Sequence, residues 1–191
     1  MFLKLIKKNR TVRRYDRSIA VTESDIAALL ECARLTASAG NFQRLRYSSV
    51  VGTAAEEAFS SISLGGFLPD DKKPNNSVAP SAYIVLASES ETPDANLLID
   101  TGISAEAITL AACEKGIGAC MIRNFKREFF FFSSNGTDYY PILVIALGYP
   151  AEEPLIYDAY EGDSLKYSVG DDFVNRVPKL TLIDLWKNKN K

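Results

Sequence analysis

The residue types best suited to holding a small ligand lie in one short segment, Ser38-Ala39-Gly40-Asn41-Phe42-Gln43. Its small residues let the backbone approach a flat ligand closely. The amides of Asn41 and Gln43 offer donors and acceptors for the polar edge of a heterocycle. Asn41 alone would also suit a left-handed turn. An ordinary helix-to-strand connection needs only one glycine or asparagine, so the segment is predicted to bind a ligand.

A cationic cluster precedes this segment, with Arg10, Arg13 and Arg14 in the run Arg10-Thr11-Val12-Arg13-Arg14-Tyr15. Guanidinium groups form strong, charge-assisted hydrogen bonds to phosphate. The two segments together predict a ligand with a phosphate at one end and a polar heterocycle at the other.

The composition excludes several kinds of chemistry. The chain has 191 residues and no histidine, which removes Ser-His-Asp and Cys-His catalysis and histidine-ligated zinc. The chemistry must therefore come from a cofactor or another side chain, and we assign no catalytic residue and no metal ligand. The net charge of −2 argues against nucleic acid as the main partner.

The cysteines indicate a reducing compartment. There are three, Cys32, Cys113 and Cys120, with no CxxC pair, so neither a disulfide framework nor a zinc site is expected. Cys32 and Cys113 lie in apolar helical patterns and are predicted to be buried. The N-terminal apolar run is too short for a signal peptide and no run approaches about 20 residues, so we expect neither a signal peptide nor a membrane span. We expect a cytoplasmic protein without a membrane partner.

The elements that must position these residues follow from hydrophobic periodicity. Residues 65–80 form a long polar loop, of a kind that is usually functional or disordered. The segment of about 150–191 is polar and predicted to be irregular up to a last short helix. The predicted helices are 2–8, 22–35, 54–61, 96–115 and 181–187, and the predicted strands are 46–52, 81–88, 117–123 and 140–147.

Three of these elements carry finer predictions. Thr22 caps its helix, but Asp25 stands where a glutamate would complete the capping box. The helix 96–115 is apolar on nearly all sides, which predicts burial in the core or in a subunit interface. The aromatic run 129–132 is predicted to be a buried segment, and Gly148-Tyr149-Pro150 to close the last core strand.

Taken in order along the chain, these motifs resemble those of the FMN-dependent nitroreductases from about Leu5 to Leu185. Each motif alone is weak, whereas their common order is a strong signal. The matching motifs are Arg10-Thr11-x-Arg13-x-Tyr15, Ser38-Ala39-Gly40-Asn41-x-Gln43, Ala79-Pro80-Ser81-Ala82, Asp100-Thr101-Gly102 opening the long helix, Gly116-Ile117-Gly118-Ala119, Gly148-Tyr149-Pro150 and Val177-Pro178-Lys179.

The resemblance implies an α+β fold with a mixed, mainly antiparallel sheet flanked by helices. It also implies a single domain over residues 1–191, an intertwined homodimer, and FMN at the subunit interface. The segment of about 150–191 would then wrap the partner subunit. The long apolar helix would bury one face in its own core and another against its twin.

The resemblance further assigns residues to the FMN phosphate. Arg10 and Lys179 would hold the phosphate, and the Thr11 hydroxyl would add a hydrogen bond. The alternative for Arg10 is a solvated helix end. Arg13 would face the isoalloxazine and ribityl groups, where a cation stabilises the reduced flavin. Its alternative is a surface ion pair that contributes little.

Other residues are assigned to the ring and the ribityl chain. Ser38, Ala39 and Asn41 would line them, and Gln43 would form a hydrogen bond to the ribityl or the ring edge. Gly118 would let the backbone approach the flavin near N5, although a simple tight turn after a helix would explain it equally well.

The implied activity is hydride transfer from NADH or NADPH through flavin N5 to a small acceptor such as a nitroaromatic or a quinone. Some positions depart from the family pattern. Arg44-Leu45 replaces the usual Pro-Trp, and Leu180 replaces an arginine. These departures leave open a member with other chemistry, such as reductive dehalogenation or flavin fragmentation, or a non-catalytic flavin-binding dimer.

Overall fold

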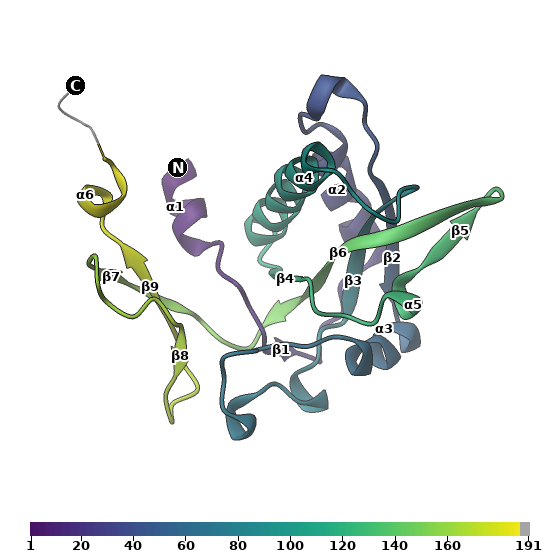
Figure 1. Ribbon diagram of the computed structural model, residues 1–191. Helices are drawn as coiled ribbons and strands as arrows, with labels where there is room; N and C mark the ends of the chain where they lie inside the picture. Colours follow the sequence, from purple (N-terminus) through teal and green to yellow (C-terminus); the bar gives the residue numbers. More distant parts are fainter. Residues whose placement is uncertain (188–191) are drawn as a thin grey trace.

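The computed structural model of the protein describes residues 1–187. The predicted fold class is confirmed, because helices flank a sheet that is antiparallel throughout (Figure 1). The helices are α1 Phe2–Lys8, α2 Glu23–Arg34, α3 Thr53–Ala58, α4 Ala95–Glu114, α5 Arg127–Phe130 and α6 Leu182–Leu185, with short 3-10 turns η1 Ala39–Asn41, η2 Phe59–Ser61, η3 Asp70–Lys72 and η4 Asn76–Val78. The strands are β1 Tyr15–Asp16, β2 Arg46–Val51, β3 Ala82–Ser88, β4 Gly118–Ile122, β5 Phe132–Ser134, β6 Thr137–Pro150, β7 Leu155–Ala159, β8 Ser168–Val169 and β9 Asn175–Leu180.

The main sheet is organised around β6, which pairs with β1, β3, β4 and β5, while β2 pairs with β3. Its predicted end was wrong, because Gly148-Tyr149-Pro150 continues the strand rather than closing it. Gly148 pairs with Gly118, and Pro150 pairs with Tyr15. A Cβ at Gly148 would lie 2.7 Å from the Tyr15 ring, so the glycine permits close packing within the sheet.

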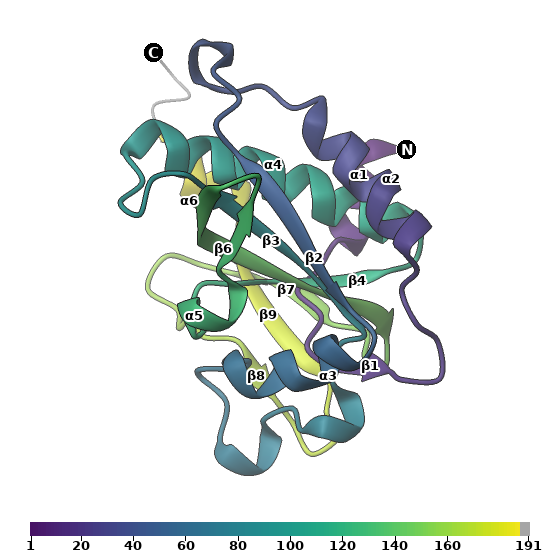
Figure 2. The ribbon, with the colours of Figure 1, turned by 90° about the vertical axis from the view of Figure 1, so that its right-hand side faces the viewer.

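Two cores lie on the two faces of this sheet (Figures 1 and 2). On one face, α2 and α4 pack against Ile84 and Ile145. On the other face, α3 and the α5 segment pack against Tyr83 and Val144. Consecutive residues of β3 therefore face opposite cores, which explains why this strand is an unbroken apolar run.

The cap of α2 differs from its prediction. The Asp25 N–H donates to Thr22 Oγ1 at 3.2 Å, and the Thr22 N–H donates to Asp25 Oδ2 at 3.1 Å. The capping box is therefore complete, since an aspartate at this position reaches the backbone as a glutamate would.

The long helix α4 agrees with its prediction to within one residue at each end. It begins after Asp94, whose carboxylate accepts the Leu97 N–H at 2.8 Å, so Asp100-Thr101-Gly102 lies in its second turn rather than opening it. Gly116 follows its end with a φ of +78°. The outer face leaves Leu98, Ile99 and Ile103 exposed.

The C-terminal segment is more regular than predicted. It contains a second sheet of order β7-β9-β8, in which β7 and β9 run parallel. Figure 1 shows this sheet and α6 set apart from the main sheet. The last four residues of the predicted arm lie outside the described range.

Two smaller predictions have mixed outcomes. Cys113 is buried as expected, whereas Cys32 is exposed, so that prediction was wrong. In the aromatic run, Phe130 is buried while Phe131 is exposed on its surface. Within residues 1–187, no helix has the length and apolar character needed to cross a membrane.

Candidate functional site

The N-terminal arginines follow the end of α1 and are fixed by backbone contacts. The Arg10 Nη2 donates to the Ile6 carbonyl oxygen at 2.7 Å, and the Val12 N–H donates to the Ala119 carbonyl oxygen at 3.0 Å. The Glu152 carboxylate accepts the backbone N–H groups of both Arg13 and Arg14. These contacts tie the arginine segment to β4 and to the chain just after β6.

Burial raises the pKa of Glu152, although the N–H groups and charges of Arg13 and Arg14 act in the opposite direction. The carboxylate nevertheless holds two successive N–H groups, which orders the backbone of the arginine pair.

The structure brings four of the predicted residues together around one cavity of roughly 320 Å³, here called the arginine cavity. These are Arg10, Thr11, Arg13 and, from the distant strand β9, Lys179. The remaining lining residues had no predicted site role, although Ala119 and Val177 belong to motifs quoted above; these residues are Asn9, Glu106, Thr109, Ala119, Met121, Tyr167 and Val177.

The polar lining suits an anion. The Arg10 Nε is buried and has no hydrogen-bond partner among the described residues, and a buried donor without an acceptor is costly. The cavity is lined by the cations Arg10, Arg13 and Lys179 against one carboxylate, that of Glu106. A phosphate group would supply the missing acceptor and balance the charge.

The predicted small-residue segment lies at a second cavity of roughly 600 Å³, here called the loop cavity. Ser38 and Gln43 line it, whereas Ala39 and Asn41 belong to the adjoining turn η1. Gly40, Asn41 and Gln43 all have positive φ, of 55°, 54° and 50°. The backbone of Asn41 therefore has the left-handed turn conformation that was expected as the alternative to ligand binding.

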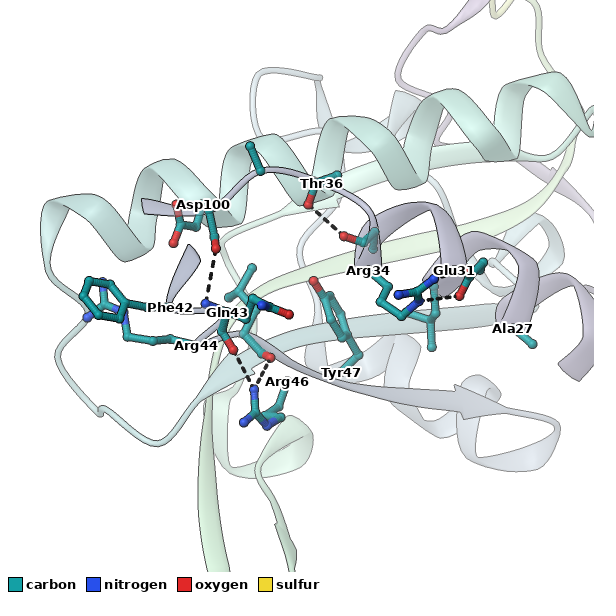
Figure 3. A pocket seen from close by; sticks show the side chains of 15 residues that line it. Ala27, Glu31, Arg34, Thr36, Phe42, Gln43, Arg44, Arg46, Tyr47 and Asp100 are labelled. Atoms are coloured by element: carbon teal, nitrogen blue, oxygen red, sulfur yellow. Dashed lines mark hydrogen bonds and ion pairs between the residues drawn. The ribbon is translucent and has the colours of Figure 1, made fainter. Parts of the chain in front are cut away.

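Internal hydrogen bonds shape this segment. The Gln43 Nε2 donates to Asn41 Oδ1 at 3.1 Å, and the Gln43 N–H donates to Ser38 Oγ at 3.2 Å. The Arg46 guanidinium donates to the carbonyl oxygens of Gln43 and Leu45, both at 2.8 Å (Figure 3).

Asp100 on α4 anchors the same segment. Its Oδ1 accepts the Ala39 N–H at 2.9 Å. Its Oδ2 is buried without a partner among the described residues, and the residue is only 3% exposed. Asp100 also lines the loop cavity (Figure 3). A buried carboxylate oxygen that lacks a donor is a ready acceptor for a ligand hydroxyl or N–H.

Arg44, which departs from the family's Pro-Trp, has a clear structural partner. Its guanidinium donates to both carboxylate oxygens of Asp94, at 2.8 and 2.9 Å. This fork, together with the Leu97 N–H, holds the pKa of Asp94 far below its usual range. The ion pair connects the loop to the residue that caps the start of α4.

The two cavities lie on opposite faces of α4. Asp100 lines the loop cavity, and Thr109 lines the arginine cavity. Nine helical residues correspond to a rise of about 14 Å and to a rotation of about two and a half turns. Within one chain, the two sets of predicted residues therefore face away from each other across the helix.

Gly118 lines a small pocket beside the arginine cavity, and Asn9, Arg10 and Ala119 line both. A Cβ at Gly118 would lie 2.9 Å from the Val12 side chain and 3.0 Å from that of Pro150. Close packing of β4 is thus sufficient reason for a glycine here. Its approach to a flavin stays a prediction.

Known structures with this fold come from several bacteria. A nitroreductase family protein from Streptococcus pneumoniae has 19% identity and a TM-score of 0.62, with 80% of this chain and 92% of that chain covered. The FMN-dependent nitroreductase NfnB from Mycobacterium smegmatis, solved with NADPH, has 16% identity and a TM-score of 0.61, covering 78% and 87%. An FMN-dependent nitroreductase from Clostridium difficile has 21% identity and a TM-score of 0.56, covering 79% and 88%.

A search of curated proteins gave no match. The sequence profile of the nitroreductase family, in contrast, matches residues 6–149, which hold the arginine segment, the small-residue loop and, except for the last residue of β6, the six strands of the main sheet. The matched span and the shared architecture agree, and the chain belongs to the nitroreductase family.

Proposed function

We propose that the protein is an FMN-dependent oxidoreductase that passes hydride from NADH or NADPH to a small electron-poor acceptor, such as a nitroaromatic or a quinone. The observation that carries this proposal is the arginine cavity, in which Arg10, Thr11, Arg13 and Lys179 converge from opposite ends of the chain. FMN dependence in two proteins of the same fold supports it.

The residues present fit the phosphate end of FMN. The free Arg10 Nε and the Lys179 ammonium would hold the phosphate oxygens, and the Thr11 hydroxyl would donate a further hydrogen bond. The Arg10 Nη2 is already committed to Ile6, which fixes the direction of the guanidinium. Arg13 lines the same cavity and would face the ring and ribityl groups.

The ring end requires the small-residue segment, which lies across α4 from the arginine cavity in the same chain. We infer that a second copy supplies it, so that each flavin lies between two subunits. The exposed apolar stripe of Leu98, Ile99 and Ile103 on α4 supports a contact between the two α4 helices. On this proposal the chain is a single domain, and its segment from about residue 150 wraps the partner.

Bound FMN would supply the chemistry itself, taking hydride at N5 from the nicotinamide and giving it to the acceptor. The protein's share is to bind and orient. Ser38, Ala39 and Asn41 would line the ring and ribityl, and Gln43 would donate or accept at the ring edge. Arg13 would stabilise negative charge on the ring, and water would deliver the proton because no histidine is present.

The test begins with purified protein incubated with FMN and then gel-filtered. We expect retained yellow absorbance, bleaching by NADH or NADPH without oxygen, and recovery of colour on adding a nitroaromatic or a quinone. Failure to retain FMN would contradict the proposal. Retained FMN that neither nicotinamide reduces would favour a non-catalytic flavin-binding dimer instead.

A further inference from the structure

Two loops that are about 100 residues apart in sequence contact each other beside the arginine cavity. One belongs to the polar segment 65–80, and the other leads through β8 toward β9 (Figure 2). The Lys72 Nζ forms an ion pair with Asp171 Oδ1 at 2.9 Å, and the Lys72 side chain is only 16% exposed. The contacts among Phe67, Lys72, Tyr167, Asp171 and Phe173 are here called the two-loop clamp.

Tyr167 is the clamp residue that reaches the arginine cavity. Its ring packs against the Arg13 guanidinium, with 4.3 Å between the guanidinium carbon and the ring centroid. Its hydroxyl accepts the Phe67 N–H at 3.4 Å, and the Phe67 ring meets it edge-on at 5.7 Å. Tyr167 therefore joins the first loop to the charge of Arg13.

Arg14 is held by the same clamp from the other side. Its Nη2 donates to the Lys72 carbonyl oxygen at 2.7 Å. The centroid of the Phe173 ring lies 4.8 Å from the Arg14 guanidinium carbon and 4.7 Å from the Lys72 ammonium nitrogen. Phe173 has a φ of +56°, which a bulky residue adopts only where its surroundings hold it there.

We propose that Tyr167 is a positioning residue for Arg13, and that the two-loop clamp fixes the arginine pair at the wall of the arginine cavity. Glu152 fixes the backbone of the pair, and the clamp fixes the two side chains. The role toward FMN rests on the proposed function. Because the Arg13 guanidinium is already held in one orientation, it loses little conformational freedom when FMN binds and presents its charge to the flavin ring.

The clamp itself is tested without flavin, by limited trypsin digestion of the full chain. We expect Asp171→Asn and Tyr167→Ala to speed cleavage after Lys72 by roughly five-fold or more, because local opening sets access to a protected bond. Glu161→Gln is the matched control, since it removes an exposed ion pair with Lys187 in the same C-terminal segment. Cleavage rates equal to the wild type in both clamp variants would overturn the clamp.

The positioning role is tested by the midpoint potential of bound FMN. We expect Tyr167→Ala to lower the preference for reduced over oxidised FMN by about two- to five-fold, which is about 10–20 mV for a two-electron couple. Tyr167→Phe keeps the ring and is expected to restore the wild-type potential. Circular dichroism confirms that each variant folds.

The outcomes separate the two proposals. Wild-type protein that takes up no FMN contradicts the proposed function and with it the role of Tyr167 toward the flavin, while the digestion still decides whether the clamp exists. If FMN binds and is reduced, an unchanged potential in Tyr167→Ala overturns the positioning role alone.

Discussion

Asp100 and Ala39 are joined by a hydrogen bond of 2.9 Å, in which a carboxylate buried on α4 accepts the backbone N–H of the small-residue segment. The bond fixes this segment to the most buried helix of the fold, next to the loop cavity. It also orients a second carboxylate oxygen that has no partner among the described residues. The segment is thus held by a charged anchor rather than by its own turn alone.

Removing this anchor is expected to weaken FMN binding. Asp100→Ala should raise the Kd for FMN by roughly ten-fold, because a hydrogen bond to a charged group is lost and the segment is released. Asp100→Asn keeps an oxygen for the Ala39 N–H and should have a smaller effect. Flavin fluorescence titration measures both. Equal Kd values for the wild type and Asp100→Ala would contradict the anchoring role.

Arg10 is expected to recognise the phosphate rather than the ring. Arg10→Ala should raise the Kd for FMN by roughly 10- to 100-fold, while the Kd for riboflavin should change by less than about two-fold, since riboflavin has no phosphate. Arg17→Ala is the control, because Arg17 pairs with Glu56 outside the cavity. Equal losses for both ligands in Arg10→Ala would mean that Arg10 supports the fold instead.

The stripe on α4 is expected to be a subunit contact. Ile99 is 60% exposed, and Ile99→Lys would place two like charges in a symmetric interface. We expect dimerisation to weaken by roughly 100-fold or more, because an isologous contact loses the residue twice. Sedimentation velocity measures the assembly. Ile19→Lys, at another exposed isoleucine, is the control, and a dimer that survives Ile99→Lys would contradict the placement.

Much of the framework was predictable because its signals are local. The buried strand β3 and the helix α4 were placed to within one residue, since long apolar runs between clear caps are distinctive. The C-terminal sheet was missed because its strands are short and carry Asp158, Arg176 and Lys179, and because β7 pairs with β9 across many residues. Such pairing leaves no periodic pattern in the sequence.

The site was only partly predictable for a related reason. Motif order indicated Arg10, Thr11, Arg13 and Lys179, but nothing local indicated that Tyr167 reaches the same cavity. A signal for the remaining residues did exist. Buried polar side chains in an apolar helix require a reason, and Asp100 and Thr109 interrupt α4 where it meets the two cavities.

Glu152 gives the protein a specific pH dependence. Burial raises its pKa above the ordinary value, so the folded protein keeps this proton to a higher pH than the unfolded chain does. Stability must then fall as pH rises through the interval between the ordinary and the raised pKa.

Glu152→Gln stays neutral throughout. The melting temperature of the wild type relative to Glu152→Gln should therefore fall as the pH rises from about 4 to about 8. Calorimetry measures it, and Glu153→Gln, at the exposed neighbouring carboxylate, is the control. If the melting temperature of the wild type instead rises relative to that of Glu152→Gln as the pH rises, the hydrogen bonds from the N–H groups of Arg13 and Arg14 outweigh the cost of burial.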